Sequence, residues 1–310
     1  MVLPFTLQQL RIVKAVAAEK SFKIAAERMF LSQPSLSKQV KILENRLGIL
    51  LFNRTNKTVN LTEAGDLFLQ YSDRILSLCE ETCRSIDDIK NGERGNLIIG
   101  GSQTIGTYFL PKILALFTKN YPQIDILLEV SSTRIITENI LNQKIDIGIV
   151  GGEIPLEFKK NLKIENFVED ELSLIIPKSH PFLSKKNKII NCEDLYHLNF
   201  ITLNSNSTVR KFTDEILAQN QIETGQFKIV MQLNSIEAIK TSVSLGLGVA
   251  FVSASAIEKE IELGTLDVVK IKNVKICRKL SIVTNVNSYK SKAFDYFYTE
   301  LNNLKSLASN

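Results

Sequence analysis

Short hydroxyl and amide side chains, together with two lysines, follow one another between residues 33 and 41 of this 310-residue chain. Side chains of these types hydrogen-bond the base edges and phosphates of DNA. Helical periodicity separates them from an apolar stripe formed by Leu36, Val40, Leu43 and Leu47. The face left for the DNA major groove carries Gln33, Ser35, Ser37, Lys38, Gln39 and Lys41.

Two helices joined by a tight turn would position this face. Ser21 is the predicted N-cap of the first helix and Ser32 the predicted N-cap of the second. Pro34 fits the first turn of the second helix, where a missing N–H costs nothing. We expect the second helix to run from residue 33 to residue 47 and to end at Gly48. A helix over residues 6–18 would support both.

The segment after Gly48 is basic and resembles a hairpin-like wing, with Leu51 and Phe52 anchoring it to the helical core. Arg54 and Lys57 would point outward and contact the DNA backbone or the minor groove. Many amphipathic helix pairs do not bind DNA, so the pair alone is weak support. Together with the wing, it predicts a winged helix-turn-helix.

The charge distribution agrees with a DNA-binding head. The chain has a net charge of +5, but residues 1–62 hold ten Lys or Arg and three Glu, a net charge of +7. The remaining residues are close to neutral, which is the distribution expected when one small domain meets phosphates. No apolar run approaches the roughly 20 residues needed to cross a bilayer, so we expect a soluble protein without a membrane partner.

The stretch AAERMFLSQPSLSKQVKILENRLGILLFNRTNKTVNLTEAG, residues 25–65, resembles the N-terminal signature of the LysR-type transcriptional regulators. Within that family it is most similar to the Rubisco-operon regulators of cyanobacteria and algal plastids. The resemblance implies a sequence-specific DNA-binding regulator controlled by a small-molecule effector, with no enzymatic activity and no cofactor. It implies the plastid stroma for an algal gene, or otherwise the bacterial cytoplasm, and allows RNA polymerase as a partner.

The resemblance also assigns roles along the second helix. Gln33, Pro34, Ser37 and Lys38 match positions used at the groove, and they are flanked by Ser32, Ser35 and Gln39. Lys38 stands where arginine is common in the family. Lysine lacks the planar fork that reads guanine, so both a base contact and a phosphate contact remain open for Lys38.

A long helix is predicted from Glu63 to Lys90, with Thr62 as its N-cap. Its apolar positions approximate a heptad seam of Ala64, Phe68, Tyr71, Ile75, Leu78 and Ile89. One domain cannot cover so long a stripe, so we expect a homodimer that places two recognition helices on DNA. Packing of this helix on its own chain is the alternative. The family commonly forms tetramers, and these residues do not distinguish a dimer from a tetramer.

Beyond a glycine-flanked linker at residues 91–95, strands alternate with helices, which predicts a doubly wound parallel α/β sheet. The predicted fold class is therefore α/β with an all-α N-terminal winged helix-turn-helix and a two-lobed effector module resembling periplasmic binding proteins. The predicted domains are residues 1–62, a linker and dimerisation helix over 63–92, and the effector-binding domain over 93–310. Lobe I comprises residues 96–170 and 270–305, and lobe II residues 171–269.

Ligands of open α/β sheets bind beyond the carboxyl ends of strands, where helix N-termini offer free N–H groups and favour anions. Hydroxyl and amide side chains occupy these places, although the same residue types are ordinary N-caps. The candidate effector contacts are Ser102, Gln103, Thr104, Ser132, Thr133, Asn204 and Ser207. An anionic metabolite suits such a cleft, and the sequence does not choose among sugar phosphates, carboxylates and dinucleotide phosphates.

Other functions find less support in the sequence. His180 and His197 have no neighbouring nucleophile or acid pair, and Cys79, Cys83, Cys192 and Cys277 are too scattered for a disulfide scaffold or metal site. We therefore expect no catalytic and no metal site. Two competing hypotheses remain, a DNA-organising protein that binds without sequence choice and an enzyme with a DNA-binding head.

Overall fold

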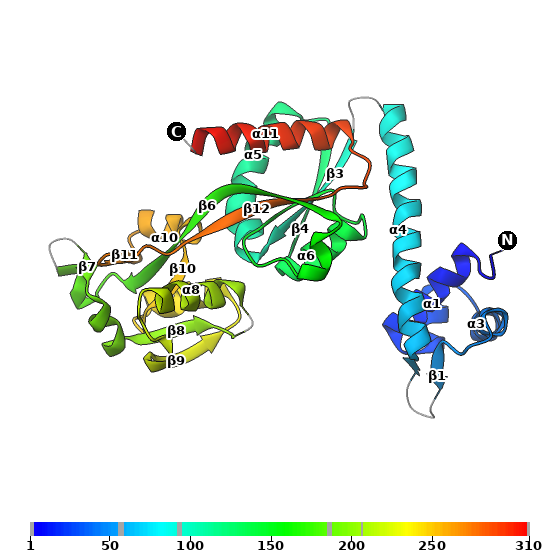
Figure 1. Ribbon diagram of the computed structural model, residues 1–310, viewed down its shortest axis with the longest axis horizontal. Helices are drawn as coiled ribbons and strands as arrows, with labels where there is room; N and C mark the ends of the chain where they lie inside the picture. The colour runs from blue at the N-terminus through cyan, green and yellow to red at the C-terminus, as the bar shows by residue number, and fades with distance from the viewer. Residues whose placement is uncertain (1–2, 55–58, 92–94, 185–187, 206, 309–310) are drawn as a thin grey trace. The chain divides into compact units, whose positions relative to one another are not determined.

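The computed structural model describes residues 3–54, 59–91, 95–184, 188–205 and 207–308. The chain divides into two compact units (Figure 1). The first, which we call the head, comprises residues 1–90 with the short segment 142–144. The second, the effector unit, comprises residues 91–141 and 145–310. Lys57, one of the predicted wing contacts, lies outside the described residues.

Three capped helices open the head: α1 (Leu7–Glu19), α2 (Phe22–Arg28) and α3 (Gln33–Leu47). The hydroxyl groups of Thr6, Ser21 and Ser32 each accept a hydrogen bond of 3.3 Å from a backbone N–H in the following first turn. Helix α3 ends at Gly48, whose φ of 70° is the left-handed conformation that glycine adopts without strain. The predicted N-caps Ser21 and Ser32 and the predicted limits of α3 are confirmed.

The apolar stripe of α3 is buried in the core of the head. Leu36, Val40 and Leu43 are fully buried there, beside the edge-to-face ring pair Phe22 and Phe52. Burial of each large apolar side chain contributes about 1.5–3 kcal/mol, so the stripe fixes which face of α3 looks outward. The wing pairs β1 (Phe52–Arg54) with β2 (Val59–Leu61) in antiparallel register.

Helix α4 (Glu63–Asn91) extends well past the three short helices of the head (Figure 1). Its predicted seam divides into two parts. Ala64 and Phe68 pack against the core of the head, so this part of the seam is covered by its own chain. Further along, Tyr71 and Leu78 are exposed. The same exposed stripe includes two positions absent from the predicted seam, Leu67 and Ile86.

The effector unit is built around a mixed sheet in the order β4-β3-β5-β12-β6-β11-β7, with β10 also paired to β6. Its lobe I strands are β3 (Gly95–Ser102), β4 (Ile124–Ser131), β5 (Ile147–Val150) and β12 (Cys277–Asn285). Its lobe II strands are β7 (Ile189–Ile190), β10 (Ala250–Ser253) and β11 (Leu266–Ile271), and β8 (Asn199–Leu203) pairs separately with β9 (Lys228–Leu233). Strand β6 (Leu162–Pro177) belongs to both lobes.

The predicted parallel pairing is confirmed for the strands within each lobe, whereas the strands that cross between the lobes pair antiparallel. β3, β4 and β5 are parallel, as are β8 and β9, but β12 runs antiparallel to both β5 and β6. β10 and β11 are also antiparallel to β6. The cause is that β6 crosses from one lobe to the other and β12 returns beside it, so both crossing strands pair with opposite direction. The sequence indicated only the apolar second half of β6, because its first half is rich in charged residues.

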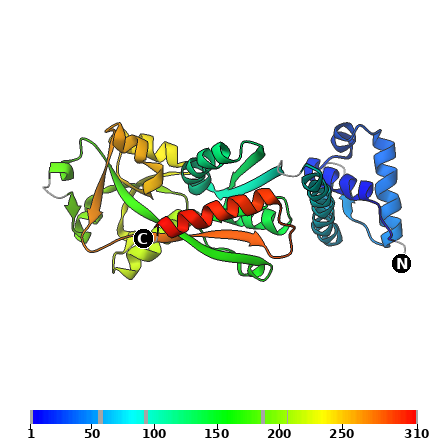
Figure 2. The same ribbon diagram turned by 90° about the horizontal axis from the view of Figure 1, so that it is seen from above.

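Helices cover these sheets. In lobe I they are the π-helical turn η1 (Ile105–Phe109), α5 (Leu110–Asn120), α6 (Thr133–Leu141), α7 (Leu156–Lys159) and α11 (Lys292–Ala308). In lobe II they are η2 (Pro181–Ser184), η3 (Cys192–His197), α8 (Thr208–Gln219), η4 (Thr224–Gln226), α9 (Ile236–Ser244), η5 (Ala254–Ala256) and α10 (Glu258–Glu262). The C-terminal helix α11 packs back on β3 and β6 and completes lobe I (Figure 2).

Candidate DNA-binding and effector sites

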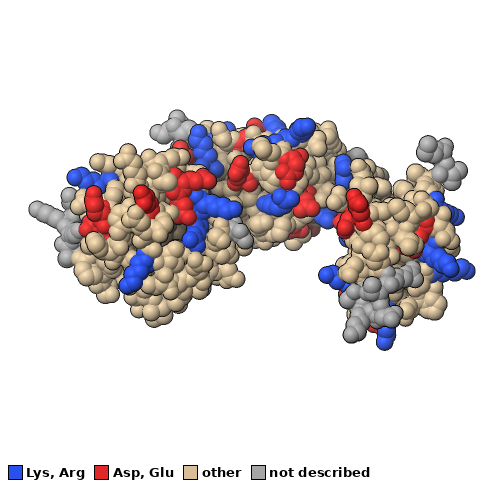
Figure 3. All heavy atoms as spheres, turned by 60° about the horizontal axis from the view of Figure 1, so that its bottom comes forward, with Lys and Arg blue, Asp and Glu red and all other residues tan. Residues whose placement is uncertain are grey.

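The outward face of α3 carries most of the predicted DNA contacts. Gln33, Pro34, Ser35 and Lys38 are exposed at its N-terminal end, and Ser37 is half-buried beside them. A recognition helix presents its N-terminal residues to base edges, so these side chains are placed as a DNA contact requires. The face of the head seen in Figure 3 carries several lysine and arginine side chains together with acidic ones, and both signs are also interspersed on the effector unit.

Two of the predicted contacts already have partners within the head. The hydroxyl of Ser32 accepts the N–H of Ser35 as the N-cap of α3. The side-chain carbonyl of Gln39 accepts a 3.2 Å hydrogen bond from the amide of Gln9 in α1. These contacts fix the helix and its neighbours in place. On the wing, Arg54 is the last residue of β1.

Glu44 connects α3 with the wing, a role that no sequence pattern predicted. Its carboxylate is buried and accepts the backbone N–H groups of Leu51 at 2.9 Å and Phe52 at 3.2 Å. A buried carboxylate must be satisfied by such donors, because an unpaired buried charge is costly. Its burial could have been predicted from its position on α3, beside Leu43 and one turn after Val40 on the buried side of the helix.

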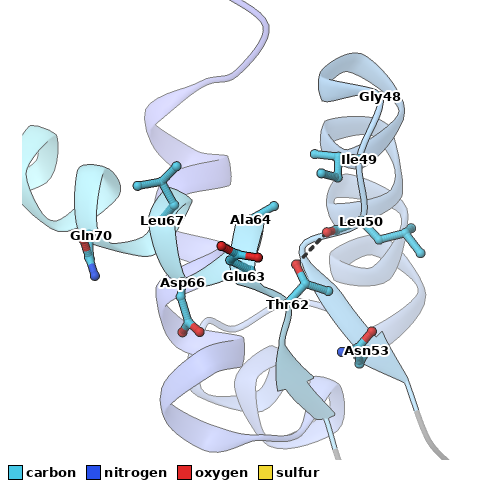
Figure 4. A pocket seen from close by; sticks show the side chains of 10 residues that line it. All are labelled: Gly48, Ile49, Leu50, Asn53, Thr62, Glu63, Ala64, Asp66, Leu67 and Gln70. Carbon is cyan, nitrogen blue, oxygen red and sulfur yellow. Dashed lines mark hydrogen bonds between the residues drawn. The ribbon is translucent and has the colours of Figure 1, made fainter.

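A groove of about 890 Å³ lies between the α3–β1 segment and the first turns of α4 (Figure 4). Its apolar lining includes Ile49, Leu50 and Leu67, all three exposed. Thr62 stands at its edge, where the hydroxyl donates to the carbonyl of Leu50 at 2.7 Å and accepts the N–H of Gly65 at 3.0 Å. The groove therefore extends the exposed apolar stripe of α4 to the segment between α3 and β1.

In the effector unit, the two lobes meet at Gly152. A Cβ atom on Gly152 would lie 2.6 Å from the Thr133 hydroxyl of lobe I and 2.8 Å from Cγ2 of Thr208 in lobe II. Thr133 is the first residue of α6 and Thr208 the first residue of α8. Two helix N-termini, each with free N–H groups and a positive dipole end, therefore converge on one corner.

Thr133 is 3% exposed, and its hydroxyl makes no hydrogen bond with any residue that the structure describes. Nearby, the hydroxyl of Ser102 accepts the N–H of Gly151 at 3.2 Å. Thus the structure brings the predicted residues Ser102 and Thr133 to the two sides of the Gly151–Gly152 pair. An unpartnered buried hydroxyl is uncommon, which makes Thr133 a candidate for contact with a ligand.

The other predicted effector residues have varied environments. Thr104 is buried, and Gln103 is exposed. Ser132 caps α6 by accepting the N–H of Ile135 at 3.3 Å. In lobe II, Ser207 occupies the N-cap position of α8 without a side-chain cap bond, and its N–H donates to the carbonyl of Asn204 at 3.0 Å. Ser207 directly precedes Thr208, and it is the side chain of Thr208 that lies at the Gly152 corner.

A buried ionic cluster lies next to this corner, and no sequence pattern indicated it. Arg278 of β12 donates from Nε to Asp170 of β6 at 2.8 Å, and Nη1 donates to the Gly151 carbonyl at 3.4 Å. Nη2 also lies 2.8 Å from the Asp170 carboxylate but makes no hydrogen bond with it. From lobe II, the Ser253 hydroxyl donates to Asp170 at 2.5 Å. The cluster thus connects Gly151 with the end of β10.

No group of three or more His, Cys, Asp or Glu side chains within the described residues could hold a metal ion. His180 accepts the N–H of Phe182 at Nδ1, and partial burial lowers its pKa. None of the helices in the described part of the chain combines the length and apolar character of a membrane span.

Comparison with known sequences gives two family matches. Residues 7–66 match the family described as "Bacterial regulatory helix-turn-helix protein, lysR family". Residues 90–304 match the family described as "LysR substrate binding domain". A "Probable RuBisCO transcriptional regulator" of Phaeodactylum tricornutum is 67% identical over 99% of this chain and 100% of its own length. One of the same name from Gracilaria tenuistipitata var. liui is 53% identical over 96% of each chain.

Solved structures show the same fold. A structure described as full-length CbnR complexed with target DNA aligns with a TM-score of 0.73 at 22% identity, over 96% of this chain and 99% of that one. The Synechocystis CcmR regulatory domain in complex with 2-PG aligns with a TM-score of 0.59 at 24% identity, over 68% of this chain and 98% of that one. The family matches and the close relatives span the head and the effector unit alike. The chain belongs to the LysR family of DNA-binding transcriptional regulators, a family of regulators and not of enzymes.

Proposed function

We propose that this protein is a plastid regulator of the Rubisco operon, which binds promoter DNA as a homodimer and responds to an anionic metabolite bound between its lobes. The names and plastid-type origin of its relatives support the target and the plastid stroma. The observation that carries the effector assignment is the corner at Gly152, where the N-termini of α6 and α8 converge on the unpartnered Thr133 hydroxyl. Such a corner favours a phosphate or carboxylate group.

Replacing Thr133 by valine tests this site. We expect the T133V variant to bind 2-PG, the ligand named for the CcmR structure, about 10- to 100-fold more weakly in isothermal titration calorimetry, because a hydrogen bond to a charged group is worth about 1.5–3 kcal/mol. Its thermal stability should not fall, since the hydroxyl has no partner in the free protein.

Thr137, one turn later in α6, provides a matched control. Its buried hydroxyl donates to the carbonyl groups of Thr133 and Arg134, both at 2.9 Å. The T137V variant should therefore lose stability and keep its affinity for 2-PG. Equal 2-PG binding by wild type and T133V, or equal weakening by both variants, would contradict the assignment of Thr133. Inorganic phosphate, tested in parallel, separates recognition of the anion from recognition of the whole metabolite.

The exposed stripe of α4 supports the proposed dimer. Leu67, Tyr71, Leu78 and Ile86 lie exposed along it, and the groove beside Leu50 continues the stripe into the head. A second copy of α4 presents the matching apolar side chains, which supports a two-fold dimer with two recognition helices on one DNA site. A single sedimenting species with the mass of the monomer at micromolar concentration would contradict this arrangement.

Lys38 tests how the head reads DNA. We expect Lys38→Ala to lower the affinity for promoter and random duplexes by the same factor, because an exposed lysine suits a phosphate better than bidentate reading of guanine. The salt dependence of log K should then decrease by about one unit of slope in fluorescence-anisotropy titrations. Arg46→Ala, at the exposed opposite end of α3, is the control.

A selective loss of promoter affinity in K38A would instead assign Lys38 to a base contact. The wild-type titrations also test the competing DNA-organising function. A regulator should prefer its promoter over random duplex by several orders of magnitude at the same salt concentration, whereas binding through the backbone alone gives a ratio near one.

A further inference from the structure

The π-helical turn η1 begins directly after the candidate effector residues Ser102 and Thr104. Such turns are rare and often occur at functional sites. Tyr108 lies in this turn, in lobe I, and its hydroxyl donates a 2.6 Å hydrogen bond to the carboxylate of Glu237 in α9, in lobe II. The turn that follows the candidate effector residues Ser102 and Thr104 therefore contacts the opposite lobe directly.

Glu237 belongs to a charged cluster around Lys240, whose side chain is buried at 5% exposure. The ammonium group of Lys240 donates to the Ala256 carbonyl at 2.9 Å and pairs with Glu237 and Glu260, each at 2.8 Å. These partners are all in lobe II. The ammonium also lies 4.8 Å from the centroid of the Tyr108 ring, so lobe I supplies one side of its environment.

Burial of a lysine is costly unless its charge is surrounded by acceptors or an aromatic face. Moving Tyr108 away would expose one side of the ammonium and remove a donor from Glu237. Burial raises the pKa of Tyr108 and the Glu237 carboxylate raises it further, so the hydroxyl remains a donor at physiological pH. Burial opposes ionisation of Glu237, but hydrogen bonds from Lys240 and Tyr108 outweigh it and lower its pKa.

We propose that Tyr108 and the Glu237–Lys240 pair form a latch between the lobes, and that Tyr108 is the positioning residue through which the Ser102–Thr104 segment acts on lobe II. The latch holds the lobe arrangement seen here, and a ligand that favours another arrangement has to release it. The signalling role of Tyr108 rests on the proposed effector function, whereas the stabilising contact between the lobes does not. A second cross-lobe pair, Lys112 with Glu258, is exposed and adds little.

Lobe I contains a matched control for this latch. The Tyr298 hydroxyl donates to Glu165 at 2.6 Å, Lys163 pairs with Glu165 at 2.9 Å, and the Lys163 ammonium lies 5.3 Å from the Tyr298 ring centroid. The same three residue types make these three contacts within lobe I, and the Tyr298 hydroxyl also accepts a 3.1 Å hydrogen bond from Lys163. Replacement of either tyrosine by phenylalanine removes one hydroxyl and keeps the ring.

Hydrogen exchange of the ligand-free, full-length protein tests the latch. We expect Tyr108→Phe to accelerate exchange of backbone amides in α9 by about fivefold, the effect of losing one net hydrogen bond. Tyr298→Phe should accelerate exchange only in β6 and α11. Unchanged exchange of α9 in Y108F, or equal acceleration of α9 in both variants, overturns the latch. This measurement tests the contact between the lobes even if the protein binds neither 2-PG nor phosphate.

A footprint on promoter DNA tests the purpose of the latch. Without ligand, Y108F should give a footprint shifted toward that of wild type saturated with 2-PG, whereas Y298F should give the wild-type footprint. A Y108F footprint identical to ligand-free wild type, in a protein whose wild-type footprint does respond to 2-PG, overturns the role of Tyr108 in signalling. A purely structural contribution of the hydroxyl would lower stability without moving the footprint.

Discussion

The full-length protein with Gly65 replaced by alanine is expected to lose promoter binding, while its effector unit remains folded. Gly65 lies in the first turn of α4, where a Cβ atom would stand 2.0 Å from the Leu51 carbonyl oxygen and 2.9 Å from Cδ2 of Leu61. The oxygen belongs to the backbone at the start of the wing and cannot rotate away. Either α4 or the wing has to move, and both belong to the DNA-binding head.

The sign of this effect is unusual. In an exposed helix interior, glycine to alanine stabilises by about 1 kcal/mol. At Gly65 the clash should exceed this gain and cost at least the 1–3 kcal/mol typical of overpacking. Anisotropy titrations with promoter DNA should show a loss of at least about 100-fold, the equivalent of roughly 2.7 kcal/mol. Circular dichroism and ligand-binding titrations would show whether the effector unit remains folded.

Gly225→Ala is the control for this experiment, because a Cβ atom there meets nothing within 4 Å. It should change neither DNA binding nor stability. A G65A protein with wild-type promoter affinity would show that the contact between α4 and the wing is looser than the structure indicates.

Replacement of Asp170 by alanine is the second change expected to have a large effect. It leaves the Arg278 guanidinium, which is 2% exposed, without its carboxylate, and it removes the acceptor of the Ser253 hydroxyl. Breaking a buried ion pair by removing one partner costs about 3–5 kcal/mol. Urea unfolding followed by circular dichroism should show this loss for the effector unit, with the head unaffected.

The double variant D170A/R278M distinguishes the effect of the unpaired Arg278 charge from the effect of losing the hydrogen bond between Arg278 and Gly151. Removal of both charges should restore most of the stability, because the buried guanidinium is gone. It should not restore the hydrogen bond from Arg278 to the Gly151 carbonyl, so 2-PG binding should remain weaker than in wild type. If the double variant is as unstable as D170A, the loss arises from packing and not from the unpaired charge.

The sequence predicted the head well because its signals are local. Ser21 and Ser32 are followed within three residues by the N–H groups they accept, and the stripe of Leu36, Val40 and Leu43 repeats at helical spacing. The positions of Ser102 and Thr133 at the carboxyl ends of apolar strands could be predicted for a similar reason, because the strands and the helices that follow them have local signals. Their proximity at the Gly151–Gly152 pair depends on the sheet, which brings distant strands together.

What the sequence did not indicate depends on contacts between distant segments. Arg278 and Asp170 are 108 residues apart, and Tyr108 and Glu237 are 129 residues apart. No spacing rule connects such pairs. The first half of β6 alternates charged and apolar residues as a surface loop also can, and its pairing with β12 alone makes it a strand. The division of the α4 seam likewise depends on where the head packs against Phe68.

The return of α11 to lobe I has a consequence for how the protein is made. Its residues Phe297 and Leu301 are fully buried in the core that contains Leu97 and Ile99 of β3. On the ribosome, about 200 residues of chain separate these two halves of one core, which corresponds to roughly 10–40 s of synthesis. The head can fold early in this interval, whereas lobe I must wait until α11 has been synthesised. A nascent chain therefore acquires its DNA-binding unit well before the unit that controls it is complete.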